Sequence, residues 1–379
     1  MDSVFLAIAM VLALPAHAAD EGVNAAMRHN FQSLMSLQPY LADEARFRSD
    51  DSKDEIRRSL GALTSVGRAL PEIVKKNRPG LKAIAEIFSE YVASAETNYR
   101  AGYKDYARSQ LRTVTGFCMA CHTRGEMAQE FKDSEDLVMK AKLTPLQKAE
   151  YFAATRQFDR ALEYYDQVVS QPAADEVAIR DINRVVRSYL NVAVRVKQDP
   201  KTAFAFVTKV SGIKGVAEFY EREIAQWKKD LASWMQEKKP AKGRSAAVLV
   251  AEAQGLVNRA RKSQMYPADH SADISYLRAT NALHESLERD PGSSAQQRAE
   301  AFYLLGTSYE ALNEPLLWDL GPLYYEACIR DWPHSEQSFK CFKRMASSIY
   351  IGFSGSGGVN VPDDQLKRLS ELRKLAQPR

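Results

Sequence analysis

Five consecutive residues carry the clearest chemistry in this chain: Cys118, Met119, Ala120, Cys121 and His122 spell C-x-x-C-H. Two thiols at this spacing reach the two vinyl groups of one haem and form thioethers, and the adjacent histidine donates a ring nitrogen to the iron. The chain holds only four cysteines and six histidines, so composition alone rarely produces this pattern. The motif therefore predicts one covalent c-type haem (heme c) on Cys118 and Cys121, with His122 as the proximal iron ligand.

Two other uses of a C-x-x-C pair fit this sequence less well. A structural zinc site needs a second close pair of ligands, but the remaining cysteines, Cys328 and Cys341, lie about two hundred residues downstream and well apart from each other. A thioredoxin-like redox pair lies at a strand-to-helix turn. Here the flanks, residues 109–114 and 124–132, are typical of helix.

The N-terminus predicts export, which is the setting that haem attachment requires. Residues 4–13 form an apolar run, and an A-x-A site at residues 16–18 predicts a signal peptide over residues 1–18. The start of this segment departs from the usual pattern, because it has Asp2 and no Lys or Arg. No later stretch approaches the roughly 20 apolar residues of a transmembrane helix. We expect a periplasmic or otherwise exported protein without a membrane span.

The balance of charged residues indicates which classes of binding partner to expect. The chain has 52 Lys and Arg against 48 Asp and Glu, a net charge of +4 over 379 residues. No segment is strongly basic, so nucleic acid is not an expected partner. The length after the signal peptide allows two or three domains, each with its own core.

The sequence around the haem motif predicts the helices that position it. Apolar residues recur every three or four positions over residues 24–41, 54–69, 81–99 and 104–123, which predicts four helices in an up-and-down bundle spanning residues 19–132. Pro39 predicts a bend or an early end of the first helix, and Pro71 predicts that the second helix ends before it. The C-x-x-C-H motif falls at the end of the fourth helix.

Residues 20–130, with the segment LRTVTGF at 111–117 leading into the motif, resemble the class II cytochromes c, the cytochrome c-prime and c-556 group. The resemblance implies a four-helix bundle with the haem at the end of its last helix. It also implies that a residue of the first helix faces the iron opposite His122: a methionine in electron carriers, or an apolar residue that leaves the iron open to small gases. In small cytochromes c, by contrast, the motif lies near the start of the chain and a methionine ligand follows it.

The second iron face has several candidates on the first helix. In many family members the critical residue comes four positions after an arginine, but four after Arg28 is Gln32, a poor iron ligand, so that correspondence fails here. Met35 is our first candidate for the distal ligand and Met27 the second, because a thioether can bind iron and raise its potential. Phe31 would instead cap an open site. Either methionine can also simply fill the core.

Three further residues are candidates for contacts with the haem. His29 is a possible iron ligand, although its polar neighbours favour an exposed side chain. Arg112 and Arg124 are candidates to pair with the haem propionates, with solvated side chains as the alternative.

From about residue 140 to 379 the pattern stays helical, so the fold class is all-α. Residues 149–172 and the set Phe302, Leu305, Gly306 and Tyr309 resemble the tetratricopeptide repeat, in which small residues let two helices pack closely. This predicts a TPR-like α-solenoid of helical repeats, with a hinge at 237–244. The glycine-rich stretch 352–358 predicts a turn rather than a phosphate loop, because neither the Lys-Ser nor the Lys-Thr step of a phosphate loop follows it.

Cys328 and Cys341 flank a turn signal between two helices, and in an oxidising compartment they are a candidate disulfide. Together these features predict an exported monohaem c-type cytochrome that transfers electrons and docks a redox partner protein on its repeats. The alternatives are a haem-based gas or redox sensor, and a repeat scaffold or assembly factor with a structural haem. Because the sequence shows no acid/base constellation, we do not expect an enzyme.

Overall fold

The computed structural model describes residues 17–77, 82–121, 143–170, 182–213, 218–238, 243–289, 294–313 and 320–378. Within these ranges the chain is almost entirely helical, with one two-stranded hairpin near the C-terminus. The expected all-α class is confirmed. Most of the predicted signal peptide, residues 1–16, lies outside the described residues.

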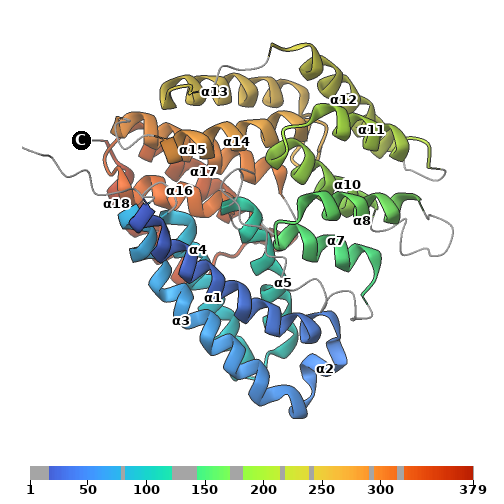
Figure 1. Cartoon of the computed structure of the whole chain (residues 1–379). Helices are drawn as coiled ribbons and strands as arrows, with labels where there is room; N and C mark the ends of the chain where they lie inside the picture. The colour runs from blue at the N-terminus through green and yellow to red at the C-terminus, as the bar shows by residue number, and fades with distance from the viewer. Residues whose placement is uncertain are drawn as a thin grey trace, which may run out of the picture.

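The first helices form a group at the lower left of Figure 1, which we call the N-terminal helix group. Consecutive long helices of this group pack against one another, α1 on α3, α3 on α4, and α4 on α5. The elements are α1 (His17–Ala42), α2 (Glu44–Arg48), the 3-10 turn η1 (Asp50–Ser52), α3 (Lys53–Asn77), α4 (Lys82–Arg100) and α5 (Lys104–Cys121).

The prediction that the second helix ends before Pro71 is wrong, because α3 continues through Pro71 to Asn77. A proline inside a helix removes one backbone hydrogen bond and costs roughly 3 kcal/mol. Here the residues on either side of it, Leu70 and Val74, are both buried and extend the apolar stripe of the helix. Packing of that stripe offsets the lost bond. Pro39 likewise lies inside α1, which ends three residues later at Ala42.

Polar contacts fasten the start of α5 to α2 and to the end of α1. Lys104 donates from Nζ to the carbonyl of Arg48 at 2.7 Å, and Arg48 pairs with Asp105. One turn further along α5, Arg108 donates from Nε to the carbonyl of Leu41 at 3.0 Å. Since α5 starts where α1 ends, the two helices run antiparallel, and the C-terminal end of α5 lies toward the N-terminal half of α1 (Figure 1).

The remaining helices form a second set, the C-terminal helix group, in the upper and right parts of Figure 1. Sequential neighbours pack as antiparallel pairs, among them α7 with α8, α13 with α14, and α15 with α16. The elements are α7 (Pro145–Ala154), α8 (Phe158–Ser170), α10 (Ile182–Leu190), the π-helix η5 (Asn191–Val196), α11 (Pro200–Val210), α12 (Glu218–Gln236), α13 (Ala246–Ser263), α14 (Asp273–Arg289), α15 (Ala295–Leu312), α16 (Leu320–Asp331), α17 (Glu336–Gly352) and α18 (Asp363–Ala376).

Gly306 shows why a small residue is needed in one of these pairs. A Cβ atom at this position of α15 would lie within 3.0 Å of three ring atoms of Tyr325 on α16. A side chain at 306 would therefore force the two helices apart. This contact agrees with the predicted close packing of two helices at Gly306.

The glycine-rich stretch near the C-terminus forms a small hairpin rather than a plain turn. Strands β1 (Ser354–Gly355) and β2 (Gly358–Val359) pair antiparallel. Gly358 has φ of +101°, a left-handed conformation that glycine adopts without strain. The predicted turn therefore joins two short strands instead of linking two helices directly.

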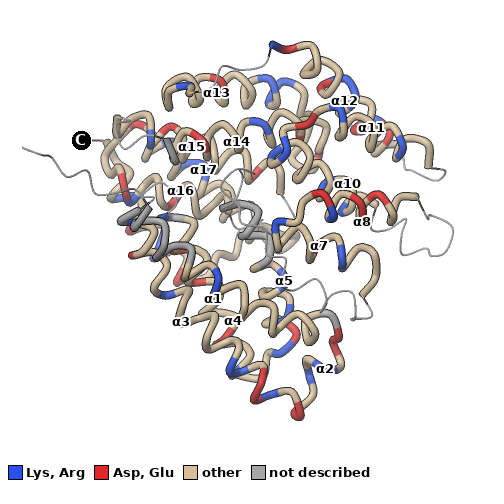
Figure 2. The backbone as a smooth tube through the Cα atoms, viewed as in Figure 1, with Lys and Arg blue, Asp and Glu red and all other residues tan. Residues whose placement is uncertain are grey.

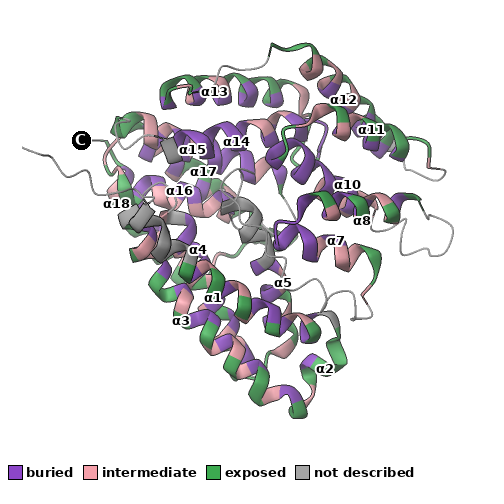
Figure 3. Cartoon of the chain, viewed as in Figure 1, coloured by how far each residue is buried: buried purple, intermediate pink, exposed green. Residues whose placement is uncertain are grey.

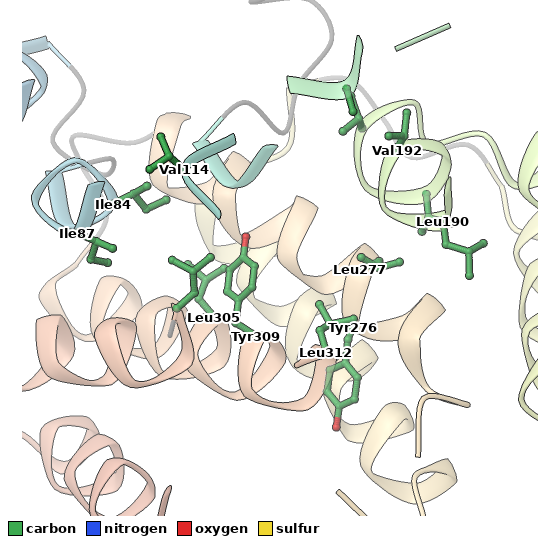
Figure 4. Close-up of a cluster of buried hydrophobic side chains, with 14 of the residues drawn as sticks. Ile84, Ile87, Val114, Leu190, Val192, Tyr276, Leu277, Leu305, Tyr309 and Leu312 are labelled. Atoms are coloured by element: carbon green, nitrogen blue, oxygen red, sulfur yellow. The ribbon is translucent and has the colours of Figure 1, made fainter. Parts of the chain in front are cut away.

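Buried apolar side chains of both helix groups belong to one connected cluster. Figure 3 shows the buried faces turned toward the interior, where the two groups meet. Figure 4 shows Val114 of α5 and Ile84 of α4 in the same cluster as Leu305 and Tyr309 of α15. The N-terminal helices therefore share their core with the C-terminal helices.

A polar cluster lies within this shared core. Arg195 of the π-helix η5 is fully buried, donates from Nε to Thr280 Oγ1 at 3.0 Å, and places its guanidinium 5.2 Å from the ring centre of Tyr309. His284 is also fully buried, with Nε2 2.9 Å from the hydroxyl of Tyr309. Burial, reinforced by the nearby Arg195 charge, lowers the pKa of His284 to about 3.

This depressed pKa predicts acid sensitivity. The unfolded chain binds a proton at His284 near pH 6.5 and the folded chain only near pH 3, so the stability that neutral His284 contributes is lost as pH falls between these values. Between pH 6.5 and 5 the loss is about 2 kcal/mol. We expect a His284→Gln variant to show a correspondingly shallower fall in unfolding free energy, measured by urea denaturation at each pH. Parallel pH profiles for the two proteins would contradict this assignment.

Cys328 of α16 and Cys341 of α17 lie at disulfide distance, with Cα atoms 6.4 Å apart. Both side chains are fully buried. The bond joins two consecutive helices across the turn at Trp332–Ser335, where the sequence predicts it.

Removal of this disulfide should destabilise the chain by about 3 kcal/mol, the loop entropy that corresponds to its sequence separation of 13. The comparison is the urea midpoint of wild type against a Cys328→Ala/Cys341→Ala variant. Reduced wild type serves as the control for the cavity that the two alanines leave. Thiols can be counted in wild type that is denatured without reduction. If Cys328 and Cys341 both react as free thiols there, the disulfide does not form.

Candidate functional site

The haem motif occupies the last turn of α5, which is built as an amphipathic helix. Ala107, Leu111 and Val114 are fully buried and follow one another at spacings of four and three residues. Positions 118 and 121 continue the same spacing. Residues three and four apart share one face of a helix, so the two cysteine positions fall in line with the stripe of Ala107, Leu111 and Val114.

The backbone of α5 is described as far as Cys121, but the side chains of residues 115–121 are not. His122 and Arg124 lie outside the described residues. Arg112 is half-buried on α5, within the described part of the helix. The predictions for these residues stay predictions.

Helix geometry relates the motif to α1. Both helices rise 1.5 Å per residue, and the contact between Arg108 and Leu41 fixes their alignment. Counting away from that contact in the two opposite directions, Cys118–Cys121 lies level with the turn of α1 at residues 28–31, to within about one turn. Residues of α1 around this turn are therefore the ones closest in height to the predicted haem.

Met27 and Phe31 are half-buried at this height, one turn apart on α1. His29 is exposed, as its polar neighbours predict, and Gln32 is exposed as well. Met27 therefore lies within about one turn of the height at which the predicted haem is attached.

Met35 lies roughly two turns further along α1 than Met27, about level with Val114. It is 7 % exposed, and its sulfur accepts a hydrogen bond from the hydroxyl of Tyr151 on α7 at 2.9 Å. This contact joins the two helix groups. The thioether thus has a structural role at the boundary between α1 and α7, and Met27 becomes the stronger candidate for the distal ligand.

Asn30 is an unexpected polar residue on this part of α1. Its side chain is 7 % exposed, and neither Nδ2 nor Oδ1 has a hydrogen-bond partner within the described structure. Leaving such groups unpaired costs about 1–3 kcal/mol. A bound group with polar atoms at this height would reduce the cost, so Asn30 fits a cofactor placed between α1 and the end of α5.

Asn30 and Tyr151 were not predicted as functional residues. Asn30 stands between charged and apolar neighbours with no motif around it, and Tyr151 acts through a contact with a residue 116 positions away. One sequence sign was present for Asn30: it falls three residues after Met27, on the apolar face of the predicted first helix.

Among the described residues, groups of three or more His, Cys, Asp or Glu side chains arranged to hold a metal ion do not occur. None of the described helices is both long and apolar enough to cross a bilayer.

Comparison of the chain with protein-family models, with curated proteins and with solved structures finds no match.

Proposed function

We propose that this chain is an exported monohaem c-type cytochrome that transfers single electrons to or from a partner protein. In this proposal the N-terminal helix group is a four-helix bundle of the class II cytochrome c type. The C-terminal helix group is a TPR-like repeat that docks the partner. The observation that carries the proposal is the C-x-x-C-H motif, whose two cysteines continue the spacing of the buried residues of α5.

The chain's residues have separate roles in this function. Cys118 and Cys121 would attach the haem covalently, and His122 would hold its iron from one side. Met27 would hold the iron from the other side, with Met35 as the alternative. The haem, when bound, supplies a one-electron couple, whose potential a thioether ligand raises.

The apolar stripe of α5 also bears on electron transfer. Ala107, Leu111 and Val114 exclude water along the stripe that leads to the motif. A low-dielectric environment around a redox centre shifts its potential and limits solvent access. The residues of α5 therefore tune the site as well as position it.

A haem sensor is the second candidate, because two observations favour an iron that is open on one side. The sulfur of Met35 already accepts a hydrogen bond from Tyr151, and the half-buried Phe31 lies at the height of the motif. An apolar ring in that place would shield the iron without binding it.

The response of the reduced spectrum to carbon monoxide distinguishes the electron carrier from the sensor. The reduced carrier should show a low-spin spectrum that carbon monoxide leaves unchanged, because both axial positions are filled. A high-spin reduced spectrum that shifts on addition of the gas would reject the methionine-bound carrier and favour the sensor.

A further inference from the structure

A second feature, separate from the haem motif, is a cavity of about 1150 Å³ in the C-terminal helix group. Its walls come from the start of α11, the end of α12, and the facing parts of α13 and α14. We propose that this cavity binds an acidic peptide segment of a partner protein. The inference does not depend on the haem, because none of its residues lies in the N-terminal helix group.

The lining of the cavity carries an excess of positive charge. Six of its side chains are basic and three are acidic. Figure 2 shows basic positions on α12, α13 and α14 in this part of the molecule. The basic residues are Lys197, Lys201, Lys238, Arg244, Arg259 and Arg278, and the acidic residues are Asp199, Glu237 and Glu252.

Ion pairs inside the cavity hold two of the arginines in place. Arg278 pairs with Glu237 and lies 4.4 Å from the ring centre of Trp234. Arg244 pairs with Glu252. These groups form a rigid wall whose charges largely cancel.

The remaining positive charge is available to a ligand. Lys201, Lys238 and Arg259 are exposed, and none of the three forms an ion pair with the described residues. Asp199, the acidic residue nearest to Lys201 in sequence, uses its carboxylate to accept from the backbone N–H groups of Lys201 and Thr202 at the start of α11. With all three carboxylates of the lining counted as ionised, its basic side chains still outnumber them by three.

Gln198 is exposed and gives the cavity an amide group that can recognise a peptide backbone. Gln198 donates from Nε2 to Oδ1 of Asn281, and Asn281 donates from Nδ2 to the carbonyl of Arg195 at 2.7 Å. Gln198 has φ of +51°, a conformation that most residues avoid and that the surrounding contacts must hold. An amide group can both donate and accept hydrogen bonds, as a peptide bond requires of its partner.

The size and spread of the site favour a peptide over a small anion. Pockets for small molecules measure about 300–1,000 Å³ and enclose most of the ligand, and this cavity is larger. Its three available cations come from three different segments: Lys201 from α11, Lys238 from the residues after α12, and Arg259 from α13. A ligand that meets all three needs several separated negative charges. A run of Asp and Glu residues provides them.

The test is fluorescence-anisotropy binding of two labelled decapeptides to the full wild-type chain. One peptide alternates Glu with Gly, and the matched peptide has Gln in place of every Glu. We expect the Glu peptide to bind at least about tenfold more tightly, and its affinity to fall as NaCl is raised. Equal affinity for the two peptides, or no binding of either, would overturn the proposal.

Charge-reversal variants test whether the Glu peptide binds in this cavity. A Lys201→Glu/Arg259→Glu variant should bind the Glu peptide at least about tenfold more weakly, and both positions are exposed, so the fold should tolerate the change. The matched control is Lys374→Glu, an equally exposed cation on α18 far along the chain, which should change the affinity less than about twofold. An equal effect of the control would place the binding elsewhere.

Inorganic phosphate distinguishes a small-anion site. Sodium phosphate and NaCl of equal ionic strength should compete equally with the Glu peptide, since only screening is involved. Displacement by phosphate at concentrations where NaCl has no effect would show that the cavity is a site for a small anion, and the peptide proposal would be wrong.

Discussion

A chain in which both Cys118 and Cys121 are replaced by alanine is expected to emerge from the cell without covalent haem. The two thioethers are the bonds that would hold the proposed cofactor on the polypeptide through denaturation, unlike the iron–ligand bonds, so their removal should abolish covalent attachment rather than weaken it. Intact-mass measurement and haem-dependent colour after denaturing electrophoresis detect the loss. We expect wild type to retain the haem through denaturation and the double variant to lose it entirely.

The single variants and a second cysteine pair serve as controls. Cys118→Ala and Cys121→Ala each leave one thioether and should retain haem in reduced yield, with a shifted absorption maximum. A Cys328→Ala/Cys341→Ala variant loses the other two cysteines and should retain haem fully, because that pair joins α16 to α17. Haem that stays on the Cys118→Ala/Cys121→Ala chain after denaturation would exclude attachment at this motif.

The second large effect concerns the methionines of α1. Met27→Ala should convert the iron from low spin to high spin and lower its reduction potential, because the distal thioether is lost. Met35→Ala should leave the spin state unchanged. Its cost should instead be about 2–5 kcal/mol of unfolding free energy, since a side chain only 7 % exposed is removed from the core. Absorption spectra in both redox states, with urea titration, measure the two effects.

Tyr151→Phe provides the matched control, because it removes the hydrogen bond to the Met35 sulfur and keeps the aromatic ring. It should lower stability slightly and leave the haem spectrum as it is. A spin change in Met35→Ala with none in Met27→Ala would restore Met35 as the distal ligand, as the sequence predicts. No spin change in either variant would point to an iron that methionine does not bind.

Periodic apolar residues were sufficient to predict the helical class and the positions of the long N-terminal helices. The expectation for residues 81–99 differs from α4 by one residue at each end. Local rules failed where tertiary packing outweighed them: Pro71 predicts an end, but the buried Leu70 and Val74 hold α3 together across it. The two short strands at Ser354–Val359 have too few residues to show any alternation.

Part of the candidate site could also be predicted from the sequence, and part could not. C-x-x-C-H is a local motif, and its place at the end of an amphipathic helix could be predicted from sequence alone. The contact between Tyr151 and Met35 joins residues 116 positions apart, and only the folded chain brings them together. The buried pair of His284 and Arg195 was also beyond prediction, because a lone charged residue at helical spacing is usually solvated.

The central claim is that this polypeptide carries one haem bound through two sulfurs. Its most direct test is the intact mass of the wild-type chain produced together with a cytochrome c maturation system and unfolded before measurement. The account predicts the mass of the exported polypeptide plus one haem, with the sharp visible bands of a reduced c-type cytochrome. A colourless protein with the mass of the polypeptide alone would contradict it.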